Sequence, residues 1–310
     1  APVSSRKRVA VVGAGPAGLA CATTLAERGH DVTLFEAADE VGGQFRMAMR
    51  VPGKEEFAET LRYFSRKVRS AGVAVRLGAR VGAGELAAGR YDDVVLATGV
   101  VPRDPRIPGQ EHPKVLSYVD VLLRGAPVGK SVAVVGAGGI GFDVAEFLVH
   151  GERTKGADGP DLATWMREWG VTDPEVEPGG VTKPRPEPPA RKVYLLQRKK
   201  TRPGAGLAKT TGWIHRAALK MKDVEMIAGA RYDRVDDRGL TVSFGEKGER
   251  TRLLEVDNVV LCTGQEPLRE LEAPLRAAGV KVHLIGGADV AAELDAKRAI
   301  EQGTRLAASL

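Results

Sequence analysis

The feature that most constrains the fold is a glycine motif that occurs twice. The segment VAVVGAGPAGLA covers residues 9–20, and VAVVGAGGIGFD covers residues 132–143. In each, an apolar run as long as a buried strand leads directly into Gly-x-Gly-x-x-Gly, and a segment that can form a helix follows. A strand, a glycine turn and a helix in this order open the βαβ units of doubly wound α/β folds. We therefore expect two such units in one chain.

The rest of the chain alternates between strand and helix patterns, which favours parallel sheets. Similar segments, VVLATG at 94–99 and VVLCTG at 259–264, close the two halves. We predict an α/β fold with two dinucleotide-binding (Rossmann-like) domains, the second inserted in the first. The predicted bounds are 1–111 and 265–310 for the first domain and 112–264 for the second.

The helices, the strands and one long excursion are predicted from local patterns. Residues 151–191 are rich in Pro, Gly and charge, so we interpret them as an excursion from the second βαβ unit. The predicted strands are 8–12, 31–36, 73–77, 93–97, 131–135, 193–196, 224–227, 231–235, 240–244 and 256–262, and the predicted helices are 17–28, 55–71, 140–150, 162–169, 208–221 and 290–309.

Composition restricts the classes of partner. The chain has 310 residues, enough for about two domains, and no apolar run approaches the ~20 residues of a membrane span, so no membrane partner is expected. The net charge is +6, but Lys and Arg are scattered and only 5% of residues are aromatic, which favours small phosphate-rich ligands over nucleic acid. Cys21 and Cys262 form no C-x-x-C pair, which favours buried thiols in a reducing cytoplasm over a redox dithiol, an Fe–S cluster or a zinc site.

The first glycine motif has the complete pattern of a dinucleotide site. Gly13 permits the tight turn, Gly15 lets a pyrophosphate approach the backbone, and Gly18 lets the helix pack on the strand. The helix N-terminus offers unpaired N–H groups to phosphates. Glu36 ends the second predicted strand, about 20 residues further on, where a carboxylate can bind ribose hydroxyls. This combination favours a dinucleotide over a purely structural turn.

Three other segments favour FAD at this first motif. They are the loop that contains Gly43, the turn that begins at Ala97, and the segment from Gly286 to Asp289 before the last predicted helix. Asp289 could bond the ribityl chain, and the helix N-terminus could stabilise negative charge on a reduced flavin; alternatively, Asp289 is a plain N-cap. The candidate residues from these patterns are Gly13, Gly15, Pro16, Gly18, Glu36, Gly43, Ala97, Thr98, Gly99, Gly287 and Asp289.

The second glycine motif favours NADPH. Its candidate residues are Gly136, Gly138, Gly139, Ile140 and Gly141, and the place of the acid is taken by the segment QRKK at 197–200. Cations attract a 2′-phosphate, and Arg can bind it bidentately, so Arg198 and Lys199 are predicted to select NADPH over NADH. The alternative is an exposed basic loop at a strand end.

Two nucleotide sites in one chain indicate a hydride relay. NADPH in the second domain would reduce FAD in the first. Because such a transfer needs no side-chain acid or nucleophile, we predict no catalytic residue, and no spacing of metal ligands is present.

Six longer runs resemble the C-terminal half of bacterial NADPH-dependent 2,4-dienoyl-CoA reductase. They are GGQF at 42–45, VPGKEEF at 51–57, HPKVLSY at 112–118, LQRK at 196–199, KTTGWIHR at 209–216 and VHLIGG at 282–287. The resemblance covers nearly the whole chain, and enoate reductases and trimethylamine dehydrogenase share the architecture. It implies FAD contacts by Ala17, Glu36, Gln44, Lys54 and Val81, and NADP contacts by Arg198 and Lys199.

The resemblance also implies an upstream half that is absent here. That half is a TIM barrel with FMN and a [4Fe–4S] cluster, and it reduces 2,4-dienoyl-CoA in fatty acid β-oxidation. The chain alone is therefore expected to oxidise NADPH and pass the electrons on. Because it begins with Ala1 instead of Met, we suspect a C-terminal fragment, although a natural stand-alone chain fits equally.

Two other functions stay open. A stand-alone NADPH-dependent flavin or ferredoxin reductase would differ only in its electron acceptor. A structural nucleotide-binding module would perform no nicotinamide chemistry, but the intact second motif and the basic strand end argue against it.

Overall fold

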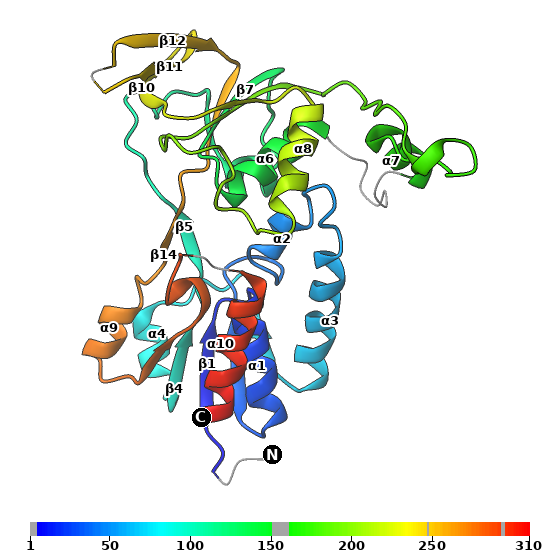
Figure 1. Ribbon diagram of the computed structural model, residues 1–310. Helices are drawn as coiled ribbons and strands as arrows, with labels where there is room; N and C mark the ends of the chain where they lie inside the picture. The colour runs from blue at the N-terminus through cyan, green and yellow to red at the C-terminus, as the bar shows by residue number, and fades with distance from the viewer. Residues whose placement is uncertain (1–4, 151–160, 247, 293–294) are drawn as a thin grey trace. The chain divides into compact units, whose positions relative to one another are not determined.

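The chain folds into two compact units (Figure 1). The computed structural model describes residues 5–150, 161–246, 248–292 and 295–310. Unit 1 comprises 1–49, 56–103 and 265–310, and unit 2 comprises 50–55 and 104–264. Unit 2 is therefore inserted in unit 1, as the predicted fold class requires.

The first expected boundary differs from the observed one. Residues 104–111, which we expected in the first domain, belong to unit 2. The reason is local packing, because the backbone N–H of Val235 donates to the carbonyl oxygen of Pro108 at 2.8 Å and Gly109 lies against the backbone of Val235.

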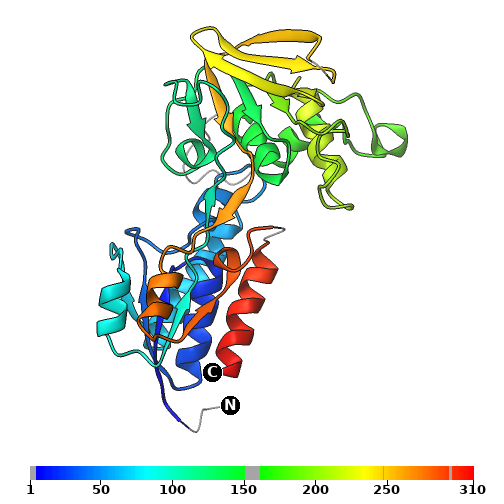
Figure 2. The same cartoon turned by 90° about the vertical axis from the view of Figure 1, so that its left-hand side faces the viewer.

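Unit 1 is built on a parallel sheet of five strands in the order β15-β4-β1-β2-β3. Helices cover both faces of this sheet (Figure 2). Val9 and Val11 point into one core and Ala10 and Val12 into the other, since successive strand residues face opposite sides. The strands are β1 (Arg8–Val12), β2 (Asp31–Phe35), β3 (Ala74–Arg76), β4 (Asp93–Leu96) and β15 (Val282–Leu284); α1 (Pro16–Glu27), α3 (Phe57–Ser70) and α10 (Ala296–Ser309) cover one face, and α4 (Ala83–Ala88) and α9 (Glu272–Ala277) the other.

Unit 2 repeats this design with a parallel sheet in the order β6-β13-β7-β8-β9. An antiparallel sheet of β10, β11 and β12 shares an apolar core with it. The elements are β6 (Val115–Ser117), α5 (Tyr118–Leu122), β7 (Ser131–Val135), α6 (Gly139–His150), β8 (Lys192–Leu196), α8 (Gly212–Met221), β9 (Glu225–Ile227), β10 (Arg231–Asp236), β11 (Gly239–Phe244), β12 (Arg250–Glu255) and β13 (Asn258–Leu261). Both five-stranded sheets are parallel throughout, which confirms the predicted α/β class.

Two predicted helices begin four or more residues later than expected. The helix predicted over 208–221 begins at Gly212, and the one predicted over 290–309 begins at Ala296. Asp295 is the N-cap of α10, because its side chain accepts a hydrogen bond from the N–H of Arg298 at 2.7 Å. Asp289 is therefore not the N-cap of the last helix.

Three short elements complete the description. In unit 1, α2 (Phe45–Ala48) precedes α3, and β5 (Val100–Pro102) pairs antiparallel with β14 (Gln265–Pro267).

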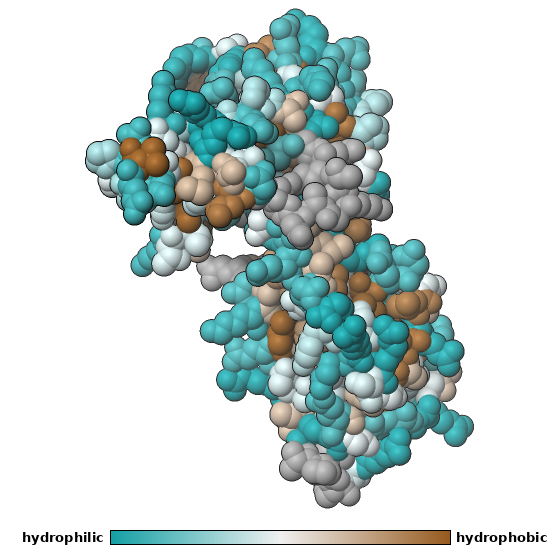
Figure 3. Space-filling view, turned by 90° about the vertical axis from the view of Figure 1, so that its right-hand side faces the viewer, coloured by the Kyte–Doolittle hydropathy of each residue, from teal (hydrophilic) through white to brown (hydrophobic). Residues whose placement is uncertain are grey.

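No helix among the described residues is long and apolar enough to cross a membrane. On the face shown in Figure 3, hydrophilic side chains predominate and apolar ones form small groups.

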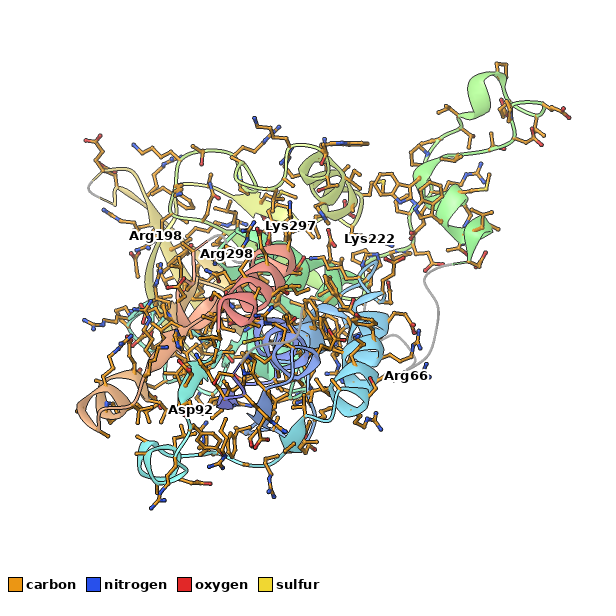
Figure 4. All side chains as sticks on the ribbon, turned by 90° about the horizontal axis from the view of Figure 1, so that it is seen from below. Arg66, Asp92, Arg198, Lys222, Lys297 and Arg298 are labelled. Carbon is orange, nitrogen blue, oxygen red and sulfur yellow. The ribbon has the colours of Figure 1, made fainter. Side chains whose placement is uncertain are left out.

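The described part of the excursion, residues 161–191, projects from the rest of unit 2 (Figure 1). It contains α7 (Leu162–Trp169) and the short 3₁₀ helix η1 (Pro178–Gly180), while 151–160 lie outside the described residues. Lys222 (labelled in Figure 4) attaches it, since its Nζ lies 2.7 Å from Glu168 Oε1 and donates to the carbonyl oxygen of Glu187 at 3.0 Å. The two side chains are only 6% and 11% exposed, so this ion pair is largely desolvated.

Lys222→Met is expected to detach residues 161–191, because it leaves the Glu168 carboxylate buried without its cation at a cost of about 3–5 kcal/mol. Cleavage by endoproteinase Glu-C at the exposed Glu175–Val176 bond of the excursion should then accelerate by about 100-fold, which limited proteolysis of the native protein would measure. Lys222→Met combined with Glu168→Leu is the matched control and should largely restore protection, because it removes both charges. A single variant cleaved at the wild-type rate would contradict the anchoring role.

Candidate functional site

The first glycine turn is tightly packed at two positions and open at the third. Gly13 has a φ of +105°, and a Cβ there would overlap the carbonyl oxygen of Ala97. A Cβ on Gly18 would overlap the carbonyl oxygen of Gly13. At Gly15 the nearest described atom would be the Cα of Gly43, 4.0 Å away. The space beside Gly15 at the N-terminus of α1 is what a pyrophosphate needs for close approach.

The second glycine turn repeats this geometry in unit 2. Gly136 has a φ of +114°, and its Cβ would overlap the carbonyl oxygen of Cys262, while a Cβ on Gly141 would overlap that of Gly136. A Cβ on Gly138 or Gly139 would meet no described atom within 4 Å. Space for a phosphate group is therefore present at the N-terminus of α6 as well.

The repeat contains candidates that the sequence analysis missed. Cys262 occupies the place in unit 2 that Ala97 has in unit 1, since the N–H of Cys262 donates to Val135 O and that of Ala97 to Val12 O, both at 2.8 Å. Burial raises the pKa of the Cys262 thiol, so it stays protonated. The similarity of VVLATG and VVLCTG was the available signal, because it makes Cys262, Thr263 and Gly264 the counterparts of the predicted Ala97, Thr98 and Gly99.

Three loops meet at the first glycine turn. The N–H of Gly42 donates to the carbonyl oxygen of Ala14 at 2.8 Å, and a Cβ on Gly43 would lie 3.0 Å from Gly15 Cα. A Cβ on Gly286 would lie 2.9 Å from Ala17 Cβ. The loops at 42–44, 97–99 and 286–289 thus converge on the start of α1, and they contain seven of the fifteen residues predicted for FAD.

Glu36 lies directly beside the first turn. Its Oε2 accepts from the N–H of Ala14 at 2.7 Å, and its Oε1 accepts from the N–H of Ala38 at 2.9 Å. A carboxylate has about four acceptor positions, so Glu36 can hold the turn and still accept ribose hydroxyls.

Gln197 is the counterpart of Glu36 in unit 2. The N–H of Gln197 donates to Ile227 O at 2.9 Å, just as that of Glu36 donates to Arg76 O at 2.9 Å. The Gln197 amide turns to its own loop, where it donates to Lys199 O at 3.0 Å. The acid of unit 1 is therefore replaced by a neutral group in unit 2.

Arg198 and Lys199, directly after Gln197, are exposed. Burial raises the pKa of Tyr232 on β10 to about 12, and the charge of Arg198 acts in the opposite direction, so the guanidinium lies within electrostatic range of this phenol. The strand end in unit 2 thus presents two cations, and Figure 4 labels Arg198.

Three residues predicted for the flavin have side chains that contact other parts of the protein. The Asp289 carboxylate accepts from Gln302 Nε2 at 2.9 Å, and Gln302 Oε1 accepts from the N–H of Gly286 at 2.8 Å. Gln44 Oε1 accepts from Gln265 Nε2 at 3.4 Å. The Val81 side chain is buried in the apolar core, which leaves its backbone to contact a ligand.

Lys54 belongs to unit 2, apart from the other residues predicted for FAD. Its Nζ lies 2.6 Å from Asp143 Oδ1 on α6. Burial raises the pKa of Asp143, while the Lys54 ammonium opposes this shift. The next acid on α6, Glu146, lies 2.7 Å from His215 Nδ1. Sequence analysis did not select Asp143, Glu146 or His215, although two acids in an otherwise apolar helix signal that each has a partner.

Two strand–glycine turn–helix repeats, each with space at the helix N-terminus, define an α/β protein with two dinucleotide-binding folds. The chain belongs to the pyridine nucleotide-disulphide oxidoreductase family, whose profile matches residues 7–298. It is accordingly a flavoprotein oxidoreductase, and FAD and NAD(P)H are the cofactors expected of this family.

Three similar proteins illustrate how much of a longer protein this chain can match. It is 27% identical over 291 residues to a metal reductase of Desulforamulus reducens (93% of this chain, 42% of that protein) and 32% identical over 293 residues to an NADH oxidase of Thermoanaerobacter brockii (93% and 38%). A solved 2-naphthoyl-CoA reductase matches 100% of this chain and 40% of its own with a TM-score of 0.80 at 24% identity, which supports the fold. The chain thus spans about two fifths of the length of these relatives.

Proposed function

We propose that the chain binds NADPH in unit 2 and FAD in unit 1, and that a hydride passes from NADPH to FAD. The observation that carries this proposal is one difference between two otherwise equivalent turns. Unit 1 has the Glu36 carboxylate at the strand end, whereas unit 2 has neutral Gln197 followed by two exposed cations. A carboxylate suits the ribose hydroxyls of FAD and repels a phosphate, while Arg and Lys attract the 2′-phosphate of NADPH.

The side chains described above serve binding and orientation. A bound nicotinamide nucleotide and a bound flavin supply the redox chemistry themselves. The N-termini of α1 and α6 would hold the two pyrophosphates, and Gly15 and Gly138 leave them room. Asp289, fixed by Gln302, would orient the flavin side chain. This division of tasks requires no catalytic acid or nucleophile.

We further propose that the electrons leave this module for a barrel domain with FMN and a [4Fe–4S] cluster, which reduces a conjugated acyl-CoA such as 2,4-dienoyl-CoA. The resemblance of the six runs supports this acceptor, and a solved relative is named a reductase of 2-naphthoyl-CoA, also a conjugated thioester. A stand-alone reductase is the second candidate, since one relative is named an NADH oxidase.

An anaerobic titration of the FAD-loaded chain tests the relay. NADPH is expected to bleach the visible flavin absorbance at far lower concentration than NADH. If NADH bleaches the flavin at the same concentration as NADPH, the result would support the relay but contradict the role of Arg198 and Lys199. A flavin that neither nucleotide bleaches would contradict the relay and favour a structural nucleotide-binding module.

A further inference from the structure

Four titratable side chains meet on one side of α6, just after the second glycine turn. Asp143 and Glu146 are three residues apart, which places them on the same face of the helix. Asp143 Oδ1 lies 2.6 Å from Lys54 Nζ, and Glu146 Oε1 lies 2.7 Å from Nδ1 of His215 in the first turn of α8. Glu146 is buried, and the other three side chains are half-buried. Phosphate binding at the helix N-terminus does not by itself require this cluster.

The loop before α8 packs on the same helix. A Cβ on Gly204 would lie 2.6 Å from Cζ of Phe142, so α6 and the loop are in close contact. Arg216, next to His215 on α8, donates from Nη1 to the carbonyl oxygen of Gly204 at 2.9 Å. Gly204 therefore contacts both α6 and α8, and it belongs to the segment 198–211 that begins with the two cations predicted to bind the 2′-phosphate. The Glu146–His215 contact joins these two helices directly.

The net charge of the cluster depends on one proton. Glu146 and Asp143 from α6 and Lys54 from residues 50–55 are the charged groups that face His215. When His215 is protonated, two cations balance two carboxylates. The hydrogen bond that His215 donates to the Glu146 carboxylate raises the pKa of His215, so this balanced state extends above the ordinary range of histidine. When the proton leaves, one carboxylate stays uncompensated in a poorly solvated position.

We propose that Glu146 and His215 are positioning residues for nicotinamide-nucleotide binding: they hold the 198–211 loop between α6 and α8, and they keep α6 free of excess negative charge. The inference rests on the proposed function of the second glycine turn. A pyrophosphate at the N-terminus of α6 is an anion, so an uncompensated carboxylate on that helix repels it. Affinity for the nucleotide should consequently fall as the pH rises through the pKa of His215.

The test measures the dissociation constant of NAD⁺ by calorimetry on the whole FAD-loaded chain between about pH 6 and 9. NAD⁺ is the probe because it leaves the flavin oxidised and lacks the 2′-phosphate, whose own titration near pH 6 would interfere. In the wild type the dissociation constant should rise on the order of 3- to 10-fold over this range. His112→Gln is the matched control, since His112 contacts Asp237 elsewhere in unit 2, and it should retain the wild-type rise.

Two variants separate charge balance from simple packing. His215→Gln removes the cation, so its dissociation constant should be high at every pH. Glu146→Gln combined with His215→Gln removes one charge of each sign, and it should restore tight binding that is independent of pH. A purely structural contact predicts no such rescue by the second substitution. A His215→Gln variant that retains the wild-type rise would overturn the inference.

A proton NMR titration of His215 gives a readout that needs no nucleotide. Its pKa should lie above 6.5 in the wild type and fall in Glu146→Gln. A His215 pKa that does not respond to Glu146→Gln would overturn the inference even if the charge variants could not be purified. If neither NAD⁺ nor NADP⁺ binds at any pH, the proposed function fails together with this inference. Binding that is independent of pH in the wild type overturns the inference alone.

Discussion

Replacing Arg198 and Lys199 together by alanine is expected to weaken NADPH binding by about 10²- to 10⁴-fold and to leave NADH binding nearly unchanged. Each charged hydrogen bond lost to the 2′-phosphate costs about 1.5–3 kcal/mol, and 1.4 kcal/mol is a tenfold change. NADH lacks that phosphate, so it has no such contact to lose. The Michaelis constants of the two cofactors, measured in the same flavin reduction assay, give the ratio.

The control for this double variant must lose the same net charge from the same unit. Lys183→Ala with Arg185→Ala does so, because both residues are exposed on the excursion. A general electrostatic attraction of NADPH to a basic surface predicts equal losses in the two double variants. If the Arg198→Ala/Lys199→Ala variant binds NADH as much more weakly as it binds NADPH, the two cations would instead act on the pyrophosphate or on the stability of the protein. That result would contradict the 2′-phosphate site.

The central strands were predictable because their sequence signal is strong and local. β1 and β7 are uninterrupted apolar runs that lead into a glycine turn, and both are completely buried at their centres. β12 was missed because half of its sequence, RTRLLE, is charged and only Leu254 is buried. β6 and β15 have three residues each, too few to show a period. Such strands form because the neighbouring strand offers them backbone hydrogen bonds.

The candidate site also contains residues that a local pattern predicts and contacts that no local pattern predicts. The glycines and Glu36 were predictable because their spacing follows from one local βαβ unit. Contacts such as Lys54 with Asp143 join residues far apart in the chain, and no local pattern indicates which cation meets which acid. Asp289 shows both cases, since the Gly-Gly-Ala-Asp run was visible but its partner Gln302 lies on α10.

Gly136→Ala is expected to destabilise the protein, whereas Gly138→Ala, only two residues away, is expected to leave its stability unchanged. At Gly136 the new Cβ meets both a φ of +114° and the backbone of Cys262. Backbone strain and overpacking each cost about 1–3 kcal/mol, so unit 2 should lose about 2–6 kcal/mol of stability. At Gly138 no described atom lies within 4 Å of a Cβ, so stability should be unchanged. Urea unfolding, followed by a probe in unit 2, measures the difference.

Nucleotide binding by the Gly138→Ala variant then separates the two roles of the motif. If the open space beside Gly138 receives a pyrophosphate, the added methyl group should weaken the binding of both NADPH and NADH in a protein of wild-type stability, because both nucleotides carry a pyrophosphate. This common loss differs from the selective loss expected at Arg198 and Lys199. A stable Gly138→Ala variant with unchanged affinity for both cofactors would mean that the second turn serves packing alone, and the hydride relay would lose its donor site.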